Sequence, residues 1–196
     1  MTALSNGINL PLDKVGMNGP ISEVKDLHKT LIPEKDGGVL SDTGRVDFAF
    51  GPAPGVFSIV KSDSPTVIEE MEYLSMGEGP YYTLYRPYHL ASVEAPRSVG
   101  MAIINNEPGL QPKTWISEVV GHAKKDLEPG ETIDGIGGFS SYGVAYPVSD
   151  SKGLAPLGLL EGGTVSKLIK AGDPISLESV ELPENLINEL RKKQKS

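Results

Sequence analysis

Hydrophobic residues in the first third of the chain change from helical to strand-like spacing. Between Ile21 and Leu31 they recur every three or four positions, which predicts a helix that ends before Pro33. From Arg45 to Phe50 apolar and polar side chains alternate, which predicts a strand with one buried face. A glycine- and proline-rich break at residues 51–55 separates it from a second predicted strand, Val56 to Val60.

A helix, a strand and another helix are predicted next. Ser64-Pro65 is a favourable helix start, and the apolar residues between Val67 and Leu74 predict one buried stripe before a stop at Gly77. The aromatic-rich segment 81–89 predicts an extended chain as far as Pro87. A helix is expected between Ala91 and Ile104, with Pro96 near its start or at a kink.

Beyond a linker at residues 107–113 the pattern changes to short strands and glycine turns. Residues 115–126 predict a strand, and residues 125–133 resemble residues 167–175, each with a turn ending in glycine followed by an acidic residue. Such a duplicated hairpin fits a small clip-like or barrel-like β domain. A final helix is predicted after Leu182, with Leu186, Ile187 and Leu190 on one face.

Near the amino terminus, residues 2–7 are typical of a last helical turn, stopped by Gly7. Because a single turn is marginal by itself, the helix is expected to start elsewhere or to be frayed.

Composition and charge exclude several classes of function. A formal net charge of −8 argues against a nucleic-acid surface, and the short basic tail from Arg191 to Lys195 is better explained as a helix end. With no cysteine, the chain has no disulfide, cysteine-ligated zinc site or thiol nucleophile. The sequence shows no signal peptide and no apolar run of membrane-spanning length, so we expect a cytoplasmic protein that contacts no membrane.

Several motifs along the chain resemble one family of enzymes. They are Tyr85-Arg86-Pro87-Tyr88-His89-Leu90, residues 36–38, 46–48, 53–57, 123–127, 130–138 and 157–159, and residues 173–183. The chain is similar to homoserine-dehydrogenase-like NAD(P)-dependent oxidoreductases with a carboxy-terminal SAF domain. That family is similar in turn to the deoxyxylulose-phosphate reductoisomerase-like proteins and the apionate oxidoisomerases.

The resemblance implies an α+β fold in two parts. Residues 1–112 would be remnant α/β catalytic-domain segments that form a partial catalytic or substrate domain, and residues 113–196 a SAF-type β-clip domain with a carboxy-terminal helix. NAD(P) would be bound mainly by a preceding nucleotide-binding domain, whose glycine-rich turn is not found in these residues. Residues 135–138 lack the spacing and the βαβ setting of that turn and are interpreted as a β-domain turn.

Arg86, Tyr88 and His89 are the candidate catalytic residues. The arginine would hold a phosphate or carboxylate with its planar fork, and the histidine or Tyr88 would donate or accept a proton. Tyr82 and Tyr85 would bind substrate oxygens. The alternative is a tyrosine-rich buried strand end, with His89 capping the next helix.

Other polar residues have more ordinary interpretations. Asp36 and Asp47 could bind a divalent cation, but no spacing forms a metal motif, so a metal stays unassigned. His28 is expected to be packed at the edge of its helix and His122 to be structural. Ser140 and Ser141 lack a triad or nucleophile-elbow pattern, which excludes serine hydrolysis.

Two functions remain open. In the first, the chain supplies the catalytic and SAF portion of a reductoisomerase-like oxidoreductase of carbohydrate metabolism, acting on a sugar phosphate or sugar acid. It would be inactive without a nucleotide-binding domain. The chain would then be a truncated reading frame, a fragment or one subunit of a split enzyme, and its partner a separate Rossmann-domain subunit or a second copy of itself in a homo-oligomer. In the second, it is a stand-alone SAF-type module that binds a small anionic carbohydrate without catalysis.

Overall fold

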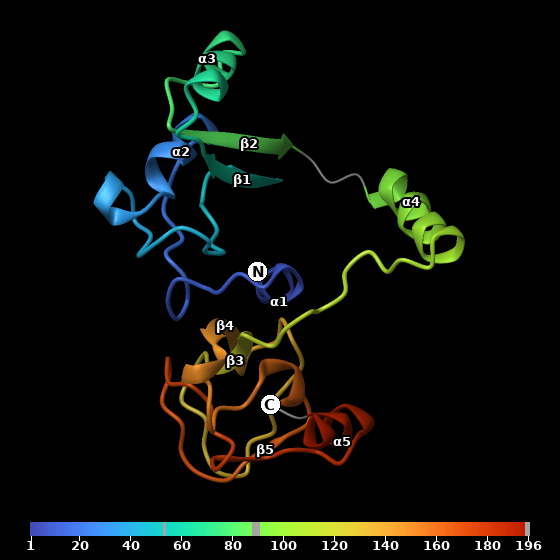
Figure 1. Cartoon of the computed structure of the whole chain (residues 1–196). Coiled ribbons are helices and arrows are strands. Elements are labelled where there is room, and N and C mark those ends of the chain that lie inside the picture. The colour runs from blue at the N-terminus through green and yellow to red at the C-terminus, as the bar shows by residue number, and fades with distance from the viewer. Residues whose placement is uncertain (53, 88–90, 195–196) are drawn as a thin grey trace. The chain divides into compact units, whose positions relative to one another are not determined.

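The computed structural model describes residues 1–52, 54–87 and 91–194, which form small antiparallel sheets and short helices (Figure 1). The fold is α+β in character, and the described residues form no closed barrel. Two compact units are distinguished: residues 17–111 form one, and residues 1–16 together with residues 112–196 form the other.

The 17–111 unit contains one two-stranded sheet and several helices. In chain order its elements are η1 (Val24–Asp26), α2 (Leu27–Thr30), η2 (Glu34–Asp36), β1 (Gly55–Lys61), α3 (Pro65–Tyr73), β2 (Tyr81–Pro87) and α4 (Ala91–Ile104). Strands β1 and β2 pair antiparallel from Gly55 opposite Pro87 to Lys61 opposite Tyr81. Phe57 and Ile59 of β1 pack against a small core of Leu27, Leu31 and Leu40.

Two predicted elements of this unit are wrong. The helix predicted over residues 21–31 is reduced to η1 and α2, and Ile21 is 88% exposed. The strand predicted at residues 45–50 is not formed; Phe50 makes only an isolated parallel bridge to Ile21. Alternation alone does not form a strand, which needs a partner over several residues, and here pairing is limited to isolated bridges at Val46 and Phe50.

Helix α3 begins as predicted but buries no stripe. Ser64 is its N-cap and Pro65 its first residue, although the Ser64 side chain makes no capping hydrogen bond. The helix ends at Tyr73, before Gly77, and none of its residues is buried; Leu74, just after it, is exposed. The apolar spacing therefore predicts the helix correctly but not the burial of its side chains.

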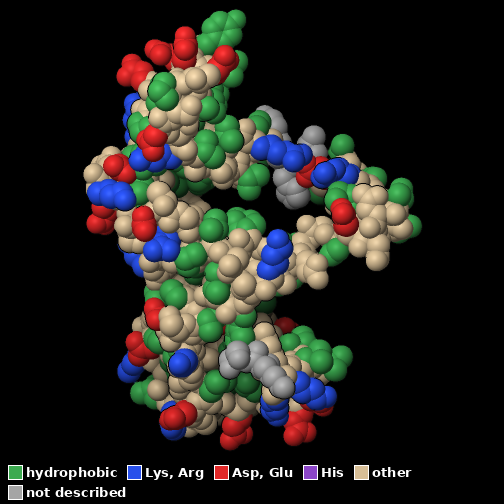
Figure 2. All heavy atoms as spheres, viewed as in Figure 1, with side chains coloured by type: hydrophobic (Ala, Val, Ile, Leu, Met, Phe, Trp, Pro, Cys, Tyr) green, Lys and Arg blue, Asp and Glu red, His purple; other side chains and the backbone are tan. Residues whose placement is uncertain are grey.

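Helix α4 spans Ala91–Ile104 with Pro96 inside, as expected. None of its residues is buried, and Val93, Val99, Ile103 and Ile104 are exposed. Figure 2 shows hydrophobic side chains on the visible surface of this helix.

The second unit is built around strands β3 and β4. Its elements are α1 (Thr2–Ile8), β3 (Ser117–Ala123), β4 (Ser141–Pro147), η3 (Val148–Asp150), η4 (Leu157–Leu159), β5 (Thr164–Val165), β6 (Val180–Glu181) and α5 (Leu186–Lys193). β3 pairs with β4 and β5 with β6, both antiparallel. The core is formed by Ala123, Leu127, Ile133, Ala155, Leu160, Val165, Ile169, Ile175 and Val180.

The two similar segments of this unit meet at one antiparallel bridge, between Leu127 and Ile169. Each segment also closes its own turn, with Glu131 N–H donating to Glu128 O and Asp173 N–H to Lys170 O, both at 3.0 Å. Leu127 and Ile169, which occupy equivalent positions, exchange backbone hydrogen bonds of 2.9 and 3.0 Å. Ile133 donates to Gly163 O and Ile175 to Gly121 O, both at 2.8 Å. Ile133 and Ile175 occupy equivalent positions of the two segments, and Gly121 and Gly163 are separated by the same number of residues as they are. Gly130 and Gly172 close the two turns in the left-handed region that glycine favours.

Both terminal helices differ from their predictions. Helix α1 continues past Gly7 to Ile8 and is capped by Asn9 (φ 57°), and asparagine is the usual alternative to glycine in this left-handed conformation. The Asn6 side chain ties α1 to β3, accepting from the amides of Ile116 and Ser117 at 3.0 Å. In α5 the predicted apolar residues Leu186, Ile187 and Leu190 are exposed, and Asn188 is buried in their place.

Candidate functional site

Strand β2 carries Tyr82, Tyr85 and Arg86, three of the residues that the sequence singled out. Tyr82 lies opposite Val60, Tyr85 opposite Phe57 and Arg86 opposite Val56. Since successive side chains on a strand point to opposite faces, Tyr82 and Arg86 share one face of the hairpin and Tyr85 lies on the other. These three residues therefore do not converge on one point.

The two tyrosines differ in their surroundings. Tyr82 is fully buried, and its hydroxyl has no hydrogen-bond partner among the described residues. The Tyr85 hydroxyl donates to the carbonyl oxygen of Pro54 at 3.4 Å.

Arg86 is the exposed cation of the strand. Its side chain is 68% exposed, and it forms an ion pair with Glu94 in the first turn of α4. Two of the predicted catalytic residues, Tyr88 and His89, lie outside the described residues.

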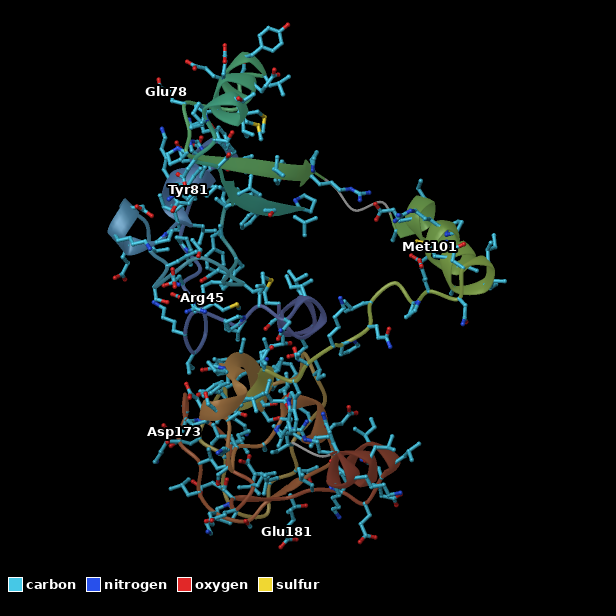
Figure 3. The ribbon with its side chains drawn as sticks, in the orientation of Figure 1. Arg45, Glu78, Tyr81, Met101, Asp173 and Glu181 are labelled. Carbon is cyan, nitrogen blue, oxygen red and sulfur yellow. The ribbon has the colours of Figure 1, made fainter. Side chains whose placement is uncertain are left out.

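A pocket of about 740 Å³ lies at the other end of β2. Its lining residues come from α2, the η2 turn and the segment that enters β2: His28, Lys29, Ile32, Asp36, Gly37, Gly77, Glu78, Gly79, Pro80 and Tyr81. Figure 3 labels Glu78 and Tyr81 at this end of the strand. Its volume is within the range of small-molecule sites.

Tyr81 and Asp36 form a short hydrogen bond at the pocket. The buried Tyr81 hydroxyl donates to Asp36 Oδ2 at 2.6 Å. This hydrogen bond, with burial and the negative charge of Asp36, raises the pKa of Tyr81 to about 12. Tyr81 is therefore a protonated donor at neutral pH, suited to positioning and not to proton transfer.

The pKa of Tyr81 gives a testable pH dependence. Its value in the folded chain, about 12, exceeds the usual 10, so its stabilisation is fully present below pH 10 and is lost as the pH rises through 12. In D36A the Tyr81 pKa should fall towards 10, because the hydrogen bond and the charge are both removed. NMR titration of the Tyr81 ring carbon Cζ measures it, and D63A, which removes only a weaker charge effect, should lower it less.

Residue-by-residue reasoning missed this pocket. His28 was interpreted as a packed histidine and Asp36 as a turn residue, and Lys29, Glu78 and Tyr81 gave no motif. Pocket residues so far apart in sequence are brought together only by the fold. The one local signal was the run Gly77-Glu78-Gly79-Pro80, since glycines flanking an acidic residue before a strand leave the main chain open.

The possible metal ligands do not form a metal site. Asp47 accepts hydrogen bonds from the amide of Asn18 at 3.0 Å and from the amide of Gly19 at 3.0 Å, so it holds a loop. No group of three or more acidic or histidine side chains within residues 1–52, 54–87 and 91–194 is arranged to hold a metal ion.

In the second unit, His122 and the residues around the 135–138 turn have structural roles. His122 is buried, with Nδ1 2.9 Å from Gly172 O and Nε2 3.0 Å from the Tyr146 hydroxyl. Asp134 holds the 135–138 turn: the Ser140 hydroxyl and the amides of Phe139 and Ser140 donate to it and lower its pKa to about 2. That turn is a β-domain loop, as the sequence predicted.

Comparison with known proteins gives a match to a protein family. Residues 1–95 match the family model described as the catalytic domain of the oxidoreductase DRL. No curated protein matches the chain. The family match supports an oxidoreductase-type catalytic portion, and in the part of the chain that the structure describes no helix has the length and hydropathy of a membrane span.

Proposed function

We propose that this chain supplies the catalytic portion of an NAD(P)-dependent, reductoisomerase-like oxidoreductase acting on a sugar phosphate or sugar acid. The observation that carries the proposal is the match of residues 1–95 to an oxidoreductase catalytic domain, a segment that includes Arg86. An exposed arginine whose described ion-pair partner is a side chain of the next helix can exchange that carboxylate for a substrate anion.

The residues that the structure describes do not fit a dinucleotide site. The sheets of the described residues are two-stranded and antiparallel, whereas a nicotinamide nucleotide is usually held at a glycine-rich turn of a parallel βαβ unit. The nucleotide is therefore assigned to a separate nucleotide-binding domain or subunit. In the proposal Arg86 holds the anionic group and Tyr88 or His89 handles the proton. Tyr82 is buried and Tyr85 lies on the other face of the hairpin from Arg86, so neither is given a part in holding the same anion.

The Arg86 assignment predicts an anion-dependent affinity. Ribose 5-phosphate should bind the full chain, neutral ribose should bind much more weakly, and R86A should weaken ribose 5-phosphate binding by at least tenfold, because a charged hydrogen bond is lost. Isothermal titration calorimetry measures the affinities. R97A, which removes a cation from α4, is the control and should bind as the parent does.

Equal binding by R86A and the parent chain would contradict this role of Arg86. The oxidoreductase part is tested separately, by following nicotinamide absorbance when the chain, NADH or NADPH and sugar substrates are combined with the protein encoded by the adjacent reading frame. Turnover should require both proteins.

A second candidate is a SAF-type module that binds a small anionic carbohydrate without catalysis. It is favoured by the self-contained core of the second unit and by the two equivalent turns at Gly130 and Gly172, which suit a β-clip. Amide shifts confined to residues 112–196 on addition of ribose 5-phosphate, unchanged in R86A, would favour this candidate over the first.

A further inference from the structure

The pocket at the start of β2 contains polar and charged side chains that no described residue pairs. Within the described residues, no hydrogen bond or ion pair is made by the His28 imidazole, the Lys29 ammonium or the Glu78 carboxylate. Groups of both signs thus line one cavity and are available to a ligand.

One side of the pocket is formed by main chain. Gly37, Gly77 and Gly79 all have positive φ angles, of 97°, 111° and 73°. Lacking side chains, they leave peptide groups open to a ligand. A Cβ on Gly79 would lie only 2.2 Å from the buried hydroxyl of Tyr82, so packing behind this wall also requires glycine.

The Asp36 carboxylate has one oxygen that can accept a hydrogen bond from a ligand. Its Oδ2 accepts the Tyr81 hydroxyl at 2.6 Å, which fixes the orientation of the carboxylate. Its Oδ1 accepts no hydrogen bond from any residue within the described ranges. The fixed carboxylate can therefore accept a ligand hydroxyl without further ordering.

The charged and polar side chains of the pocket determine which class of ligand it can bind. Two carboxylates disfavour a phosphate or another multiply charged anion, and the lining groups are not arranged to hold a metal in the described chain. Hydroxyl groups both donate and accept, so a chain of them can donate to Asp36 and Glu78 and accept from Lys29 and His28. We propose that this pocket binds the hydroxyl-bearing carbon chain of a small polyol or sugar.

This site is distinct from the one proposed around Arg86. Tyr81 and Arg86 are five residues apart on β2, about 16 Å along the strand, and their side chains point to opposite faces. That separation is longer than a five- or six-carbon sugar, so one small substrate does not occupy both places. The inference therefore goes beyond the proposed function and does not rest on it.

NMR titration of the isotope-labelled full chain tests the proposal. Sorbitol and gluconate carry similar hydroxyl chains, one neutral and one charged, and both should shift the amides of Gly37, Gly77 and Gly79 saturably. D36N should weaken sorbitol binding by about tenfold or more. E78Q, on the exposed rim, should also weaken it and serves if D36N disturbs the η2 turn, whereas E72Q on α3 lies outside the pocket lining and should bind as the parent does.

The absence of shifts at these three glycines with sorbitol would overturn the proposal. So would shifts with inorganic phosphate or L-serine but not with sorbitol, or unchanged sorbitol affinity in both D36N and E78Q. R86A should bind sorbitol as the parent does. The ribose 5-phosphate titration therefore tests the role of Arg86, and the sorbitol titration tests the pocket independently.

Discussion

Replacing Leu127 by alanine should lower the free energy of unfolding of the second unit by about 2–5 kcal/mol, the usual cost of truncating a fully buried leucine. Leu127 is 1% exposed and belongs to the core of this unit. Its backbone pairs with that of Ile169, so the side chain lies where the two similar segments meet. A cavity there removes contacts from both segments at once.

Urea unfolding followed by the fluorescence of Trp115 measures this effect. Trp115 is the single tryptophan of the chain and lies in the same unit, where the Arg191 guanidinium stacks 4.3 Å from its ring. L168A is the matched control, because Leu168 is the neighbour of Ile169 but is exposed; its loss should stay below about 1 kcal/mol. Similar losses for L127A and L168A would show that Leu127 is not part of a packed core.

Replacing Gly38 by alanine should destabilise the 17–111 unit by roughly 3 kcal/mol, at the upper end of overpacking effects. A Cβ at this position would lie 2.1 Å from the carbonyl oxygen of Ile32, a backbone atom that no rotamer change can move. The same oxygen accepts the amide of Leu40 at 3.0 Å, so relieving the clash breaks this hydrogen bond. The η2 turn, which presents Asp36 to the pocket, should be displaced with it.

Hydrogen exchange of the Leu40 amide reports this change directly. In G38A the amide should exchange much faster than in the parent chain, and the Tyr81 signal should shift as its contact with Asp36 is lost. The control is G37A. A Cβ there meets no atom within 4 Å, and only the left-handed φ of 97° opposes it, at a cost of about 1–2 kcal/mol. A Leu40 amide equally protected in G38A and the parent chain would contradict the predicted clash.

The sequence by itself determined the elements whose signals are local. The Ser64-Pro65 start of α3, strands β1 and β2, helix α4 and strand β3 all lie where capping residues, alternation and proline positions predict them. The glycine turns at residues 130 and 172 were also readable, since a left-handed turn requires a residue without a side-chain penalty. These features depend on residues within a few positions of one another.

The tertiary structure decided which of these patterns acquired partners. The alternation at residues 45–50 remained without a full strand partner, the apolar residues of α3 were not buried, those of α5 stayed exposed, and the two similar segments met at one bridge. The pocket arose in the same way, because residues 28, 29, 36, 78 and 81 meet only after β2 returns beside the early helices. Pairing and burial are set by contacts between distant segments, whose free energy no local pattern encodes.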